Sequence, residues 1–235
     1  MSLNSSFDCP VWTPLHLTRT LLVRHVKQRA AEVILRMLAE SGTRNIKVLD
    51  VGCGHMPYKR CFDFYPEVVY KGADIPWAGV QPDYAIDPTT GCIDAETSTF
   101  DVVVHFQTLE HVPNYKVFLD ECFRVLRPGG TLICTLPFMF PYHAVPNDYR
   151  RWTIEGLAYD LSAVGFTAVT TTSVESDAVS LITILELYIS ECLGYVVTKP
   201  LFFAMNLIGW AFQNSRRSNY YLHSSATARK PGSLS

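Results

Sequence analysis

The sequence predicts an α/β fold in which a parallel sheet is covered by helices on both faces. Short apolar runs rich in β-branched residues alternate with segments whose apolar residues recur every three or four positions. The first pattern is typical of buried strands, and the second is typical of amphipathic helices. Strands that alternate with helices along a chain indicate a parallel sheet covered on both sides.

The N-terminal half is expected to form one helix and four strands. The helix is expected over residues 16–41, because Leu22, Val26 and Ala30 recur at helical spacing. The four strands are expected over residues 47–51, 68–73, 84–86 and 101–106. The first strand stops at a Gly-Cys-Gly sequence, which favours a tight turn, and the next two stop at aspartates.

The C-terminal half continues this alternation and then departs from it. Helices are expected over residues 117–126 and 153–164, and strands over residues 131–136 and 166–172. Thr153 is suited to cap the second of these helices and Gly165 to end it. Two apolar helices broken near residues 198–200 are expected within the segment 178–213. Residues 220–229 are expected to form a last strand that returns to the sheet edge.

Composition and charge argue against several classes of protein. The chain has 235 residues, 48% of them apolar, and a formal net charge of −2. This length suits a single domain over residues 1–235, and the composition argues against disorder. A near-neutral balance argues against nucleic acid as a partner. The seven cysteines contain no C-x-x-C pair, so reduced thiols and a cytoplasmic location are expected, without a zinc or other metal site.

Small and acidic residues follow the first three predicted strands, where ligands bind in an open α/β sheet. Gly52-Cys53-Gly54 would let the backbone approach a ligand closely. Asp74 lies 24 residues after Asp50, about where nucleotide-binding folds place a ribose-binding acid. Asp87 closes the third strand and could meet an adenine amine. The alternatives are plain turns for the glycines and helix caps for the acids.

Four segments together resemble class I S-adenosylmethionine-dependent methyltransferases of the type 11-like group. These are VLDVGCG (residues 48–54), Asp74, FDVVVHFQTLEHV (residues 100–112) and FRVLRPGGTLICTLPF (residues 123–138). The resemblance implies a Rossmann-like, doubly wound sheet of about seven strands, the last one antiparallel. It also implies S-adenosyl-L-methionine as the cofactor and a cofactor-binding core over residues 45–174.

The resemblance also implies roles for particular residues. Asp50 and the loop of Gly52, Cys53 and Gly54 would surround the methionine end of the cofactor. Asp74 would bind the ribose, and Asp87 would face the adenine edge. Phe106 and Gln107 would line the pocket after the fourth strand.

An enzyme that uses a nicotinamide dinucleotide is the rival within this fold class, because it also needs glycines and a ribose acid. Its G-x-G-x-x-G pattern fails here, since Pro57 occupies the third glycine position. That glycine leaves a helix N-terminus open to a pyrophosphate. S-adenosylmethionine has no pyrophosphate, so the departure favours the methyltransferase.

Methyl transfer to a hydroxyl requires a positioned acceptor and removal of its proton. The candidate catalytic residues are His111, in the Glu-His-Val sequence, and His143, Asp148 and Tyr149, in the long loop of residues 137–153. The alternatives are a turn-stabilising role for His111 and a surface ion pair of Asp148 with a neighbouring arginine. The acceptor is expected to be a small molecule or a glycan, methylated at oxygen.

The two terminal helical segments carry the remaining expectations. The helix of residues 15–42 is expected to form a lid over the cofactor. The helical insertion of residues 178–213 would be a cap, a dimer face or a peripheral membrane contact, and its longest clean apolar run is too short to span a bilayer. The alternative function is a non-catalytic S-adenosylmethionine-binding protein that acts through this insertion. The oligomeric state stays open.

Overall fold

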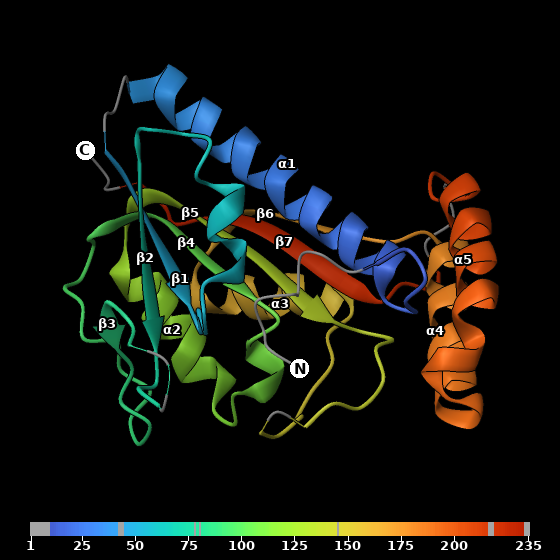
Figure 1. The fold of residues 1–235 in the computed structure, drawn as a ribbon. Helices are drawn as coiled ribbons and strands as arrows, with labels where there is room; N and C mark the ends of the chain where they lie inside the picture. Colours follow the sequence, from blue (N-terminus) through green and yellow to red (C-terminus); the bar gives the residue numbers. More distant parts are fainter. Residues whose placement is uncertain are drawn as a thin grey trace.

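The computed structural model describes residues 10–41, 45–77, 79, 81–144, 146–215 and 219–232. These residues form a seven-stranded sheet in the order β3-β2-β1-β4-β5-β7-β6 (Figure 1). The strands are β1 (Ile46–Val51), β2 (Val68–Asp74), β3 (Tyr84–Ala85), β4 (Phe100–Phe106), β5 (Leu126–Pro137), β6 (Thr167–Ser173) and β7 (His223–Arg229). β7 is antiparallel to both of its neighbours, and the other pairings are parallel. The α/β fold with an antiparallel last strand is therefore confirmed.

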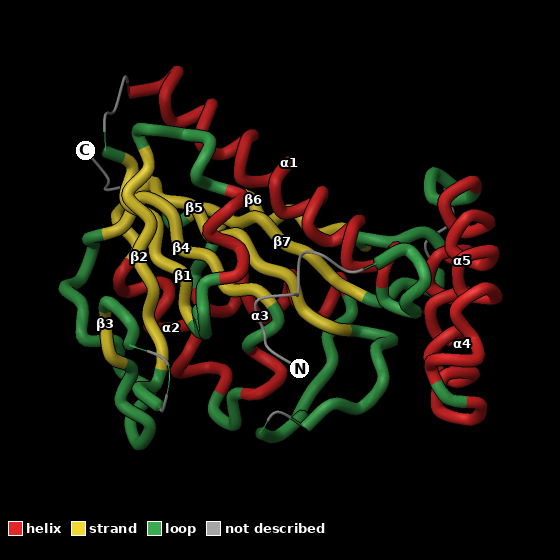
Figure 2. Tube along the Cα trace, in the orientation of Figure 1, coloured by secondary structure: helices red, strands yellow, loops and turns green. Residues whose placement is uncertain are grey.

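Helices cover both faces of the sheet (Figure 2). One face is covered by α1 (His16–Ser41) and the other by α2 (Tyr115–Val125) and α3 (Ile154–Val164). The hairpin of α4 (Asp177–Leu193) and α5 (Tyr195–Ala211) lies beyond one end of the sheet (Figure 1). Two short 3-10 helices are η2 (Pro57–Cys61) and η3 (Leu109–His111). Neighbouring strand residues point to opposite faces. Val48 accordingly belongs to the buried cluster that contains Ile34 of α1, and Leu49 to the cluster that contains Leu119 of α2.

Helix α3 shows how local chemistry sets its bounds. The Thr153 hydroxyl accepts a hydrogen bond from the Gly156 N–H at 3.0 Å, so it caps the helix as the sequence predicts. At the other end Gly165 has a φ of 110°, a left-handed conformation that glycine adopts without steric cost.

The final strand corrects one expectation. β7 does not lie at the sheet edge, because it pairs with β5 on one side and β6 on the other, and β6 is the edge strand. Its sequence HSSATAR has mostly small side chains, and five of its seven residues are buried, as is typical of an inner strand. As a consequence, the first residue of β7, His223, lies opposite Pro137, the last residue of β5.

The break between the last two helices also differs from the expected position. It falls at Gly194, whose φ is 78°, and not near residues 198–200. Pro200 lies inside α5. A glycine with a positive φ leaves the helical conformation and ends α4, whereas Pro200 removes only one intrahelical hydrogen bond from α5.

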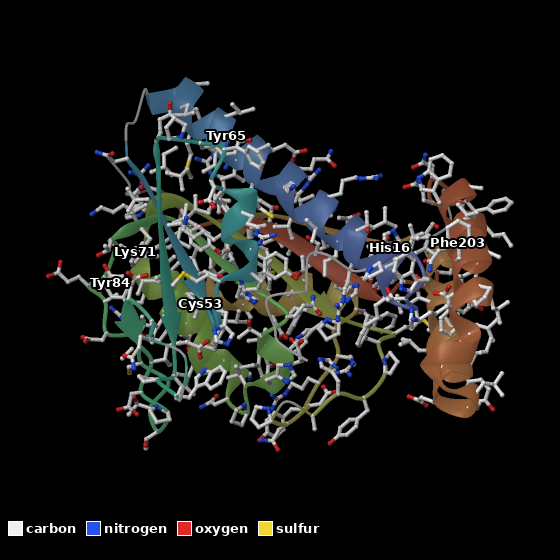
Figure 3. The ribbon with its side chains drawn as sticks, in the orientation of Figure 1. His16, Cys53, Tyr65, Lys71, Tyr84 and Phe203 are labelled. Atoms are coloured by element: carbon white, nitrogen blue, oxygen red, sulfur yellow. The ribbon has the colours of Figure 1, made fainter. Side chains whose placement is uncertain are left out.

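The α4–α5 hairpin has an unusual distribution of polarity. It buries Ser180, Thr183 and Glu186 of α4 and Asn206 of α5. Its outer surface carries large apolar side chains, including Phe203, labelled in Figure 3, which is 45% exposed. Within the described residues no helix combines the length and the apolar character needed to cross a membrane.

Gly52→Ala is expected to destabilise the fold by roughly 2–4 kcal/mol, since it adds overpacking to a strained backbone. The new Cβ would lie 2.0 Å from Thr108 Cγ2, and the φ of Gly52 is 76°. Gly54→Ala is the matched control, because Gly54 also has a positive φ but a Cβ there would have no heavy atom within 4 Å. It should cost only about 1 kcal/mol. Urea unfolding measures both, and equal losses would contradict this account.

Candidate active site

The loop after β1 is held against the end of β2. The N–H groups of Gly52 and Cys53 both donate to the Ala73 carbonyl, at 2.8 and 3.2 Å. Beyond this anchor Gly54 has a φ of 50° and open space where a side chain would begin. The loop therefore exposes backbone at the carboxyl edge of the sheet, where a ligand can approach it.

Asp74 connects this loop to the end of β2. One of its carboxylate oxygens accepts from the Gly54 N–H and the other from the Ile75 N–H, each at 2.7 Å. Each oxygen still has a free lone pair, so the carboxylate can also accept from the two hydroxyls of a ribose. Burial raises the pKa of Asp74.

Asp50 lies deeper, near the end of β1. Its side chain is buried and accepts a hydrogen bond from the Tyr70 hydroxyl at 2.7 Å. Burial raises the pKa of Asp50 to about 7, and the negative charge of Asp74 acts in the same direction. Burial likewise raises the pKa of Cys53, so its sulfur is a neutral thiol. In Figure 3 Cys53 lies at the lower end of β1.

The other three residues expected to contact the cofactor differ in burial and in hydrogen bonding. Phe106 is buried, with its ring 4.6 Å from that of Tyr58. Gln107 follows it with a φ of 53°, and its side-chain amide donates to the Thr135 hydroxyl at 3.2 Å. Asp87 is exposed, and its carboxylate accepts the N–H groups of two residues in its own turn, which lowers its pKa. Asp87 thus already has a local capping role.

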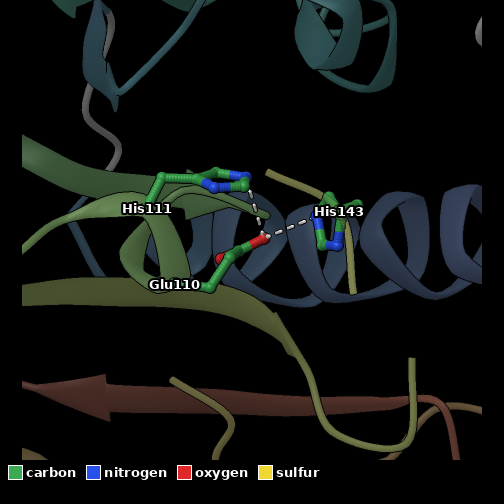
Figure 4. A group of neighbouring side chains, drawn as sticks. All are labelled: Glu110, His111 and His143. Atoms are coloured by element: carbon green, nitrogen blue, oxygen red, sulfur yellow. Dashed lines mark ion pairs between the residues drawn. The ribbon is translucent and has the colours of Figure 1, made fainter. Parts of the chain in front are cut away.

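Glu110 and two histidines form a cluster just beyond β4. The Glu110 side chain is fully buried, and neither of its carboxyl oxygens has a hydrogen-bond partner. Nε2 of His111 lies 3.6 Å from Glu110 Oε1, and Nε2 of His143 lies 3.8 Å from the same oxygen (Figure 4). The two rings meet edge to face, with centroids 5.1 Å apart.

The opposite ring nitrogens determine what these histidines present to Glu110. Nδ1 of His111 is 2.5 Å from the Asn147 carbonyl oxygen, and Nδ1 of His143 is 3.2 Å from that of Pro141. A carbonyl oxygen only accepts, so each Nδ1 carries the hydrogen and each neutral ring turns an Nε2 lone pair toward Glu110. Three acceptors therefore converge on one small space.

Three acceptors this close together repel one another unless a hydrogen or a cation lies between them. Burial raises the pKa of Glu110 to about 7, so a proton can occupy the carboxyl near neutral pH. A hydroxyl hydrogen of a ligand fits the same position. One carboxylate and two imidazoles are also a ligand set used for divalent metals, and their ligand atoms lie within 4.8 Å of one another.

Asp148 holds the loop that supplies His143. Its carboxylate accepts from both terminal nitrogens of the Arg151 guanidinium and from the His143 backbone N–H. The arginine holds the pKa of Asp148 well below its usual range. Tyr149 is 47% exposed, and its backbone N–H donates to the Glu110 carbonyl at 2.8 Å. The structure thus brings the two predicted histidines together, whereas Asp148 forms an ion pair that shapes their loop.

Three acidic or basic residues at this edge were not among the candidates from the sequence: Glu110, Glu175 and His223. Glu110 directly precedes His111, but only the conformation of η3 shows that it points inward. His223 reaches the edge through its pairing opposite Pro137. Its Nδ1 is 2.6 Å from Glu175 Oε1. No local pattern links residues so far apart in the chain.

Glu110→Gln is expected to raise the free energy of unfolding at pH 8 by roughly 2–3 kcal/mol. The folded protein holds a proton on Glu110 more tightly than the unfolded chain, because burial raises its pKa from 4.5 to about 7. Stability from this group is present below pH 4.5 and is lost as the pH rises to 7. Glutamine cannot ionise, so the variant and the original should differ by less than about 1 kcal/mol at pH 5.

Urea unfolding at the two pH values measures this difference. Glu121→Gln is the control, since Arg124 lowers the pKa of Glu121 and its loss should reduce stability at pH 8. A Glu110→Gln variant less stable than the original at pH 8 would show that Glu110 is paired in solution.

Comparison with known proteins gives the family. A family model described as a methyltransferase domain matches residues 22–163. A ubiquinone biosynthesis O-methyltransferase from Cereibacter sphaeroides is 32% identical over 164 residues, which are 61% of this chain and 64% of that protein. The human mitochondrial protein of the same name is 29% identical over 140 residues, 53% of this chain and 38% of that one.

The curated relatives are matched only in part, and the structural neighbours are distant in sequence. The chain spans less than half the length of the first relatives it matches, 39% for the one from Maricaulis maris and 48% for one from Xylella fastidiosa. The [4+2]-cyclase SpnF superposes with a TM-score of 0.58 at 19% identity and covers 88% of this chain and 81% of its own. A Haemonchus contortus phosphoethanolamine N-methyltransferase gives 0.55 at 14% identity, covering 87% of this chain and 52% of its own.

The two solved structures establish the fold. The methyltransferase family model covers more than half of the chain. The chain belongs to the class I S-adenosylmethionine-dependent methyltransferases.

Proposed function

We propose that this protein transfers the methyl group of S-adenosylmethionine to a hydroxyl oxygen of a small molecule. The observation that carries the proposal is the buried, unbonded Glu110 carboxyl faced by two imidazoles. It lies just beyond β4, the strand that pairs directly with β1, and β1 leads into the glycine loop. A surface for the methyl donor and a group that handles protons therefore lie beside each other.

The residues around the loop fit the cofactor. Asp74 would accept from the ribose hydroxyls, and the open backbone at Gly54 would receive the methionine end. The acidic groups Asp50 and Asp74 favour a cationic ligand and disfavour a pyrophosphate. When bound, the cofactor supplies an electrophilic methyl group on a sulfonium. Roles for Cys53, Asp87, Phe106 and Gln107 remain predictions.

The residues of the chain would orient the acceptor and receive its proton. The converging acceptors of Glu110, His111 and His143 suit an O–H that points toward them. Around them the loop of residues 138–152 offers aromatic side chains, among them Phe140, whose ring is 5.3 Å from that of His143. The relatives named ubiquinone biosynthesis O-methyltransferase support oxygen as the methylated atom. We therefore favour a hydroxylated aromatic ring as the acceptor, and a glycan remains the alternative.

A peripheral membrane contact through the α4–α5 hairpin is kept as part of this proposal. Its support is the set of large apolar side chains that the hairpin exposes, among them Leu181, Leu207 and Trp210. A long apolar acceptor would enter from such a surface. A cap over the core and a dimer face are the other roles that fit the same exposure.

Asp74→Ala is expected to weaken S-adenosylmethionine binding by roughly 1–3 kcal/mol, which is about 5- to 150-fold in Kd. The cause is the loss of a charged acceptor for two ribose hydroxyls. Calorimetric titration measures the affinity. Asp120→Ala, an exposed acid on α2, is the control and should bind as the unmodified protein does. An unchanged Kd for Asp74→Ala would remove Asp74 from the cofactor site.

The function itself is tested by incubating the protein with S-adenosylmethionine and a panel of hydroxylated aromatic compounds, with and without an apolar tail. S-adenosylhomocysteine and the methylated product should appear together. Glu110→Gln should lower kcat by about 10²-fold, the scale of misplacing the acceptor hydroxyl that Glu110 helps to orient, and leave cofactor binding intact. Tight cofactor binding without turnover on any hydroxyl, amine or carbon acceptor would instead favour a non-catalytic binding protein.

A further inference from the structure

A second carboxylate–imidazole pair lies at the same edge of the sheet. His223 begins β7, and Glu175 follows the end of β6. Glu175 Oε1 lies 2.6 Å from Nδ1 of His223, and Glu175 Oε2 accepts the His223 backbone N–H at 3.0 Å. The Thr18 hydroxyl of α1 also donates to Oε1, at 2.8 Å. Three donors thus fix the Glu175 carboxylate, which in turn fixes the ring of His223.

This contact determines the tautomer of His223. A carboxylate bonded to Nδ1 keeps the hydrogen on that nitrogen, so Nε2 is the atom left to accept a proton. The carboxylate also stabilises the imidazolium that forms when a proton arrives. Nδ1 of His111 is bonded to a neutral backbone carbonyl, and Nδ1 of His143 to another at 3.2 Å. The Asp148 carboxylate lies 3.5 Å from Nδ1 of His143, but it is already paired with the Arg151 guanidinium. Both contacts stabilise a positive ring less well than the short Glu175 contact does.

His223 and His143 of the Glu110 cluster contact the same aromatic ring. The ring of His223 lies 5.5 Å from the ring of Phe140, which itself lies 5.3 Å from the ring of His143. A positive charge on His223 would lower the pKa of Glu110, so the two groups are electrostatically coupled. The side chain of His223 is 5% exposed, which keeps competing water largely away from it.

We infer that His223, oriented by Glu175, is the general base that takes the proton of the acceptor hydroxyl. This inference rests on the proposed function. In the step, the O–H proton passes to Nε2 of His223 while the oxygen forms a bond to the methyl carbon. The carbon–sulfur bond breaks, and its electron pair stays on sulfur, giving the methyl ether and S-adenosylhomocysteine. Glu175 is a positioning residue, because it acts through the imidazole.

The kinetic test compares His223→Asn with His143→Asn on an acceptor identified as above. His223→Asn should lower kcat by about 10²–10⁴-fold, the range for loss of a general base, with the Kd for S-adenosylmethionine unchanged. It should also abolish the fall of kcat/KM on the acidic side of the pH profile, while His143→Asn keeps it. Loss of that acidic limb in His143→Asn and its retention in His223→Asn would overturn the inference.

Two further variants separate chemistry from structure. Glu175→Gln should lower kcat and shift the acidic limb, and Glu175→Asp should recover part of the rate. His25→Gln is the matched control, because His25 is a partly buried histidine bonded to Ser225 of the same strand. It should keep the acidic limb of the original enzyme. A Glu175→Gln profile identical to the original would remove the positioning role.

The tautomer of His223 can be measured without any methyl transfer, so it tests the role of His223 separately from the proposed function. Imidazole ¹⁵N NMR of the cofactor-free protein should show the neutral ring of His223 with its hydrogen on Nδ1, and Glu175→Gln should alter that signal. A hydrogen on Nε2 would overturn the base assignment even if the protein methylates hydroxyls. Absence of methyl transfer with the expected tautomer would instead count against the function.

Discussion

The close approach of Gly52 to Thr108 is the contact on which the site depends. It joins the loop after β1 to the segment after β4, the two central parallel strands where the order of the sheet reverses. Ligands bind at this point in open α/β sheets. Because a side chain at position 52 would collide with Thr108, the sheet can bring the glycine loop and the Glu110 cluster together only with glycine there.

Buried acids give this edge its chemical character. Burial raises the pKa of both Asp50 and Glu110 to about 7, so each carries a free-energy cost of ionisation near neutral pH. Asp50 is partly compensated by the Tyr70 hydroxyl, whereas the oxygens of Glu110 have no hydrogen-bond partner. Strongly perturbed carboxyls are concentrated at functional sites, and here they accompany the glycine loop at the carboxyl edge of the sheet. In the proposed function, the positive charge of the methyl donor would offset the charge of Asp50, and the acceptor hydroxyl would donate a hydrogen bond to Glu110.

The elements outside the core converge on the same edge. Helix α1 contributes Thr18 to the Glu175 carboxylate, and the antiparallel insertion of β7 carries His223 to the end of β5. The α4–α5 hairpin starts directly after this group, and it has polar side chains inside and apolar side chains outside. Burial raises the pKa of Glu186 within it to about 8. In the proposed function, these elements would lie on the acceptor side of the site.

The sequence by itself determined the α/β class, most element bounds and the position of the glycine loop after β1, because hydrophobic period, glycine turns and caps act over a few residues. The bounds of α1 and the cap at Thr153 follow from such local rules. The tertiary structure decided the inner position of β7, the helix break at Gly194, the meeting of Glu110 with His143, and the pairing of His223 with Glu175. Strand order and side-chain convergence depend on contacts between residues far apart in the chain, and no local pattern encodes them.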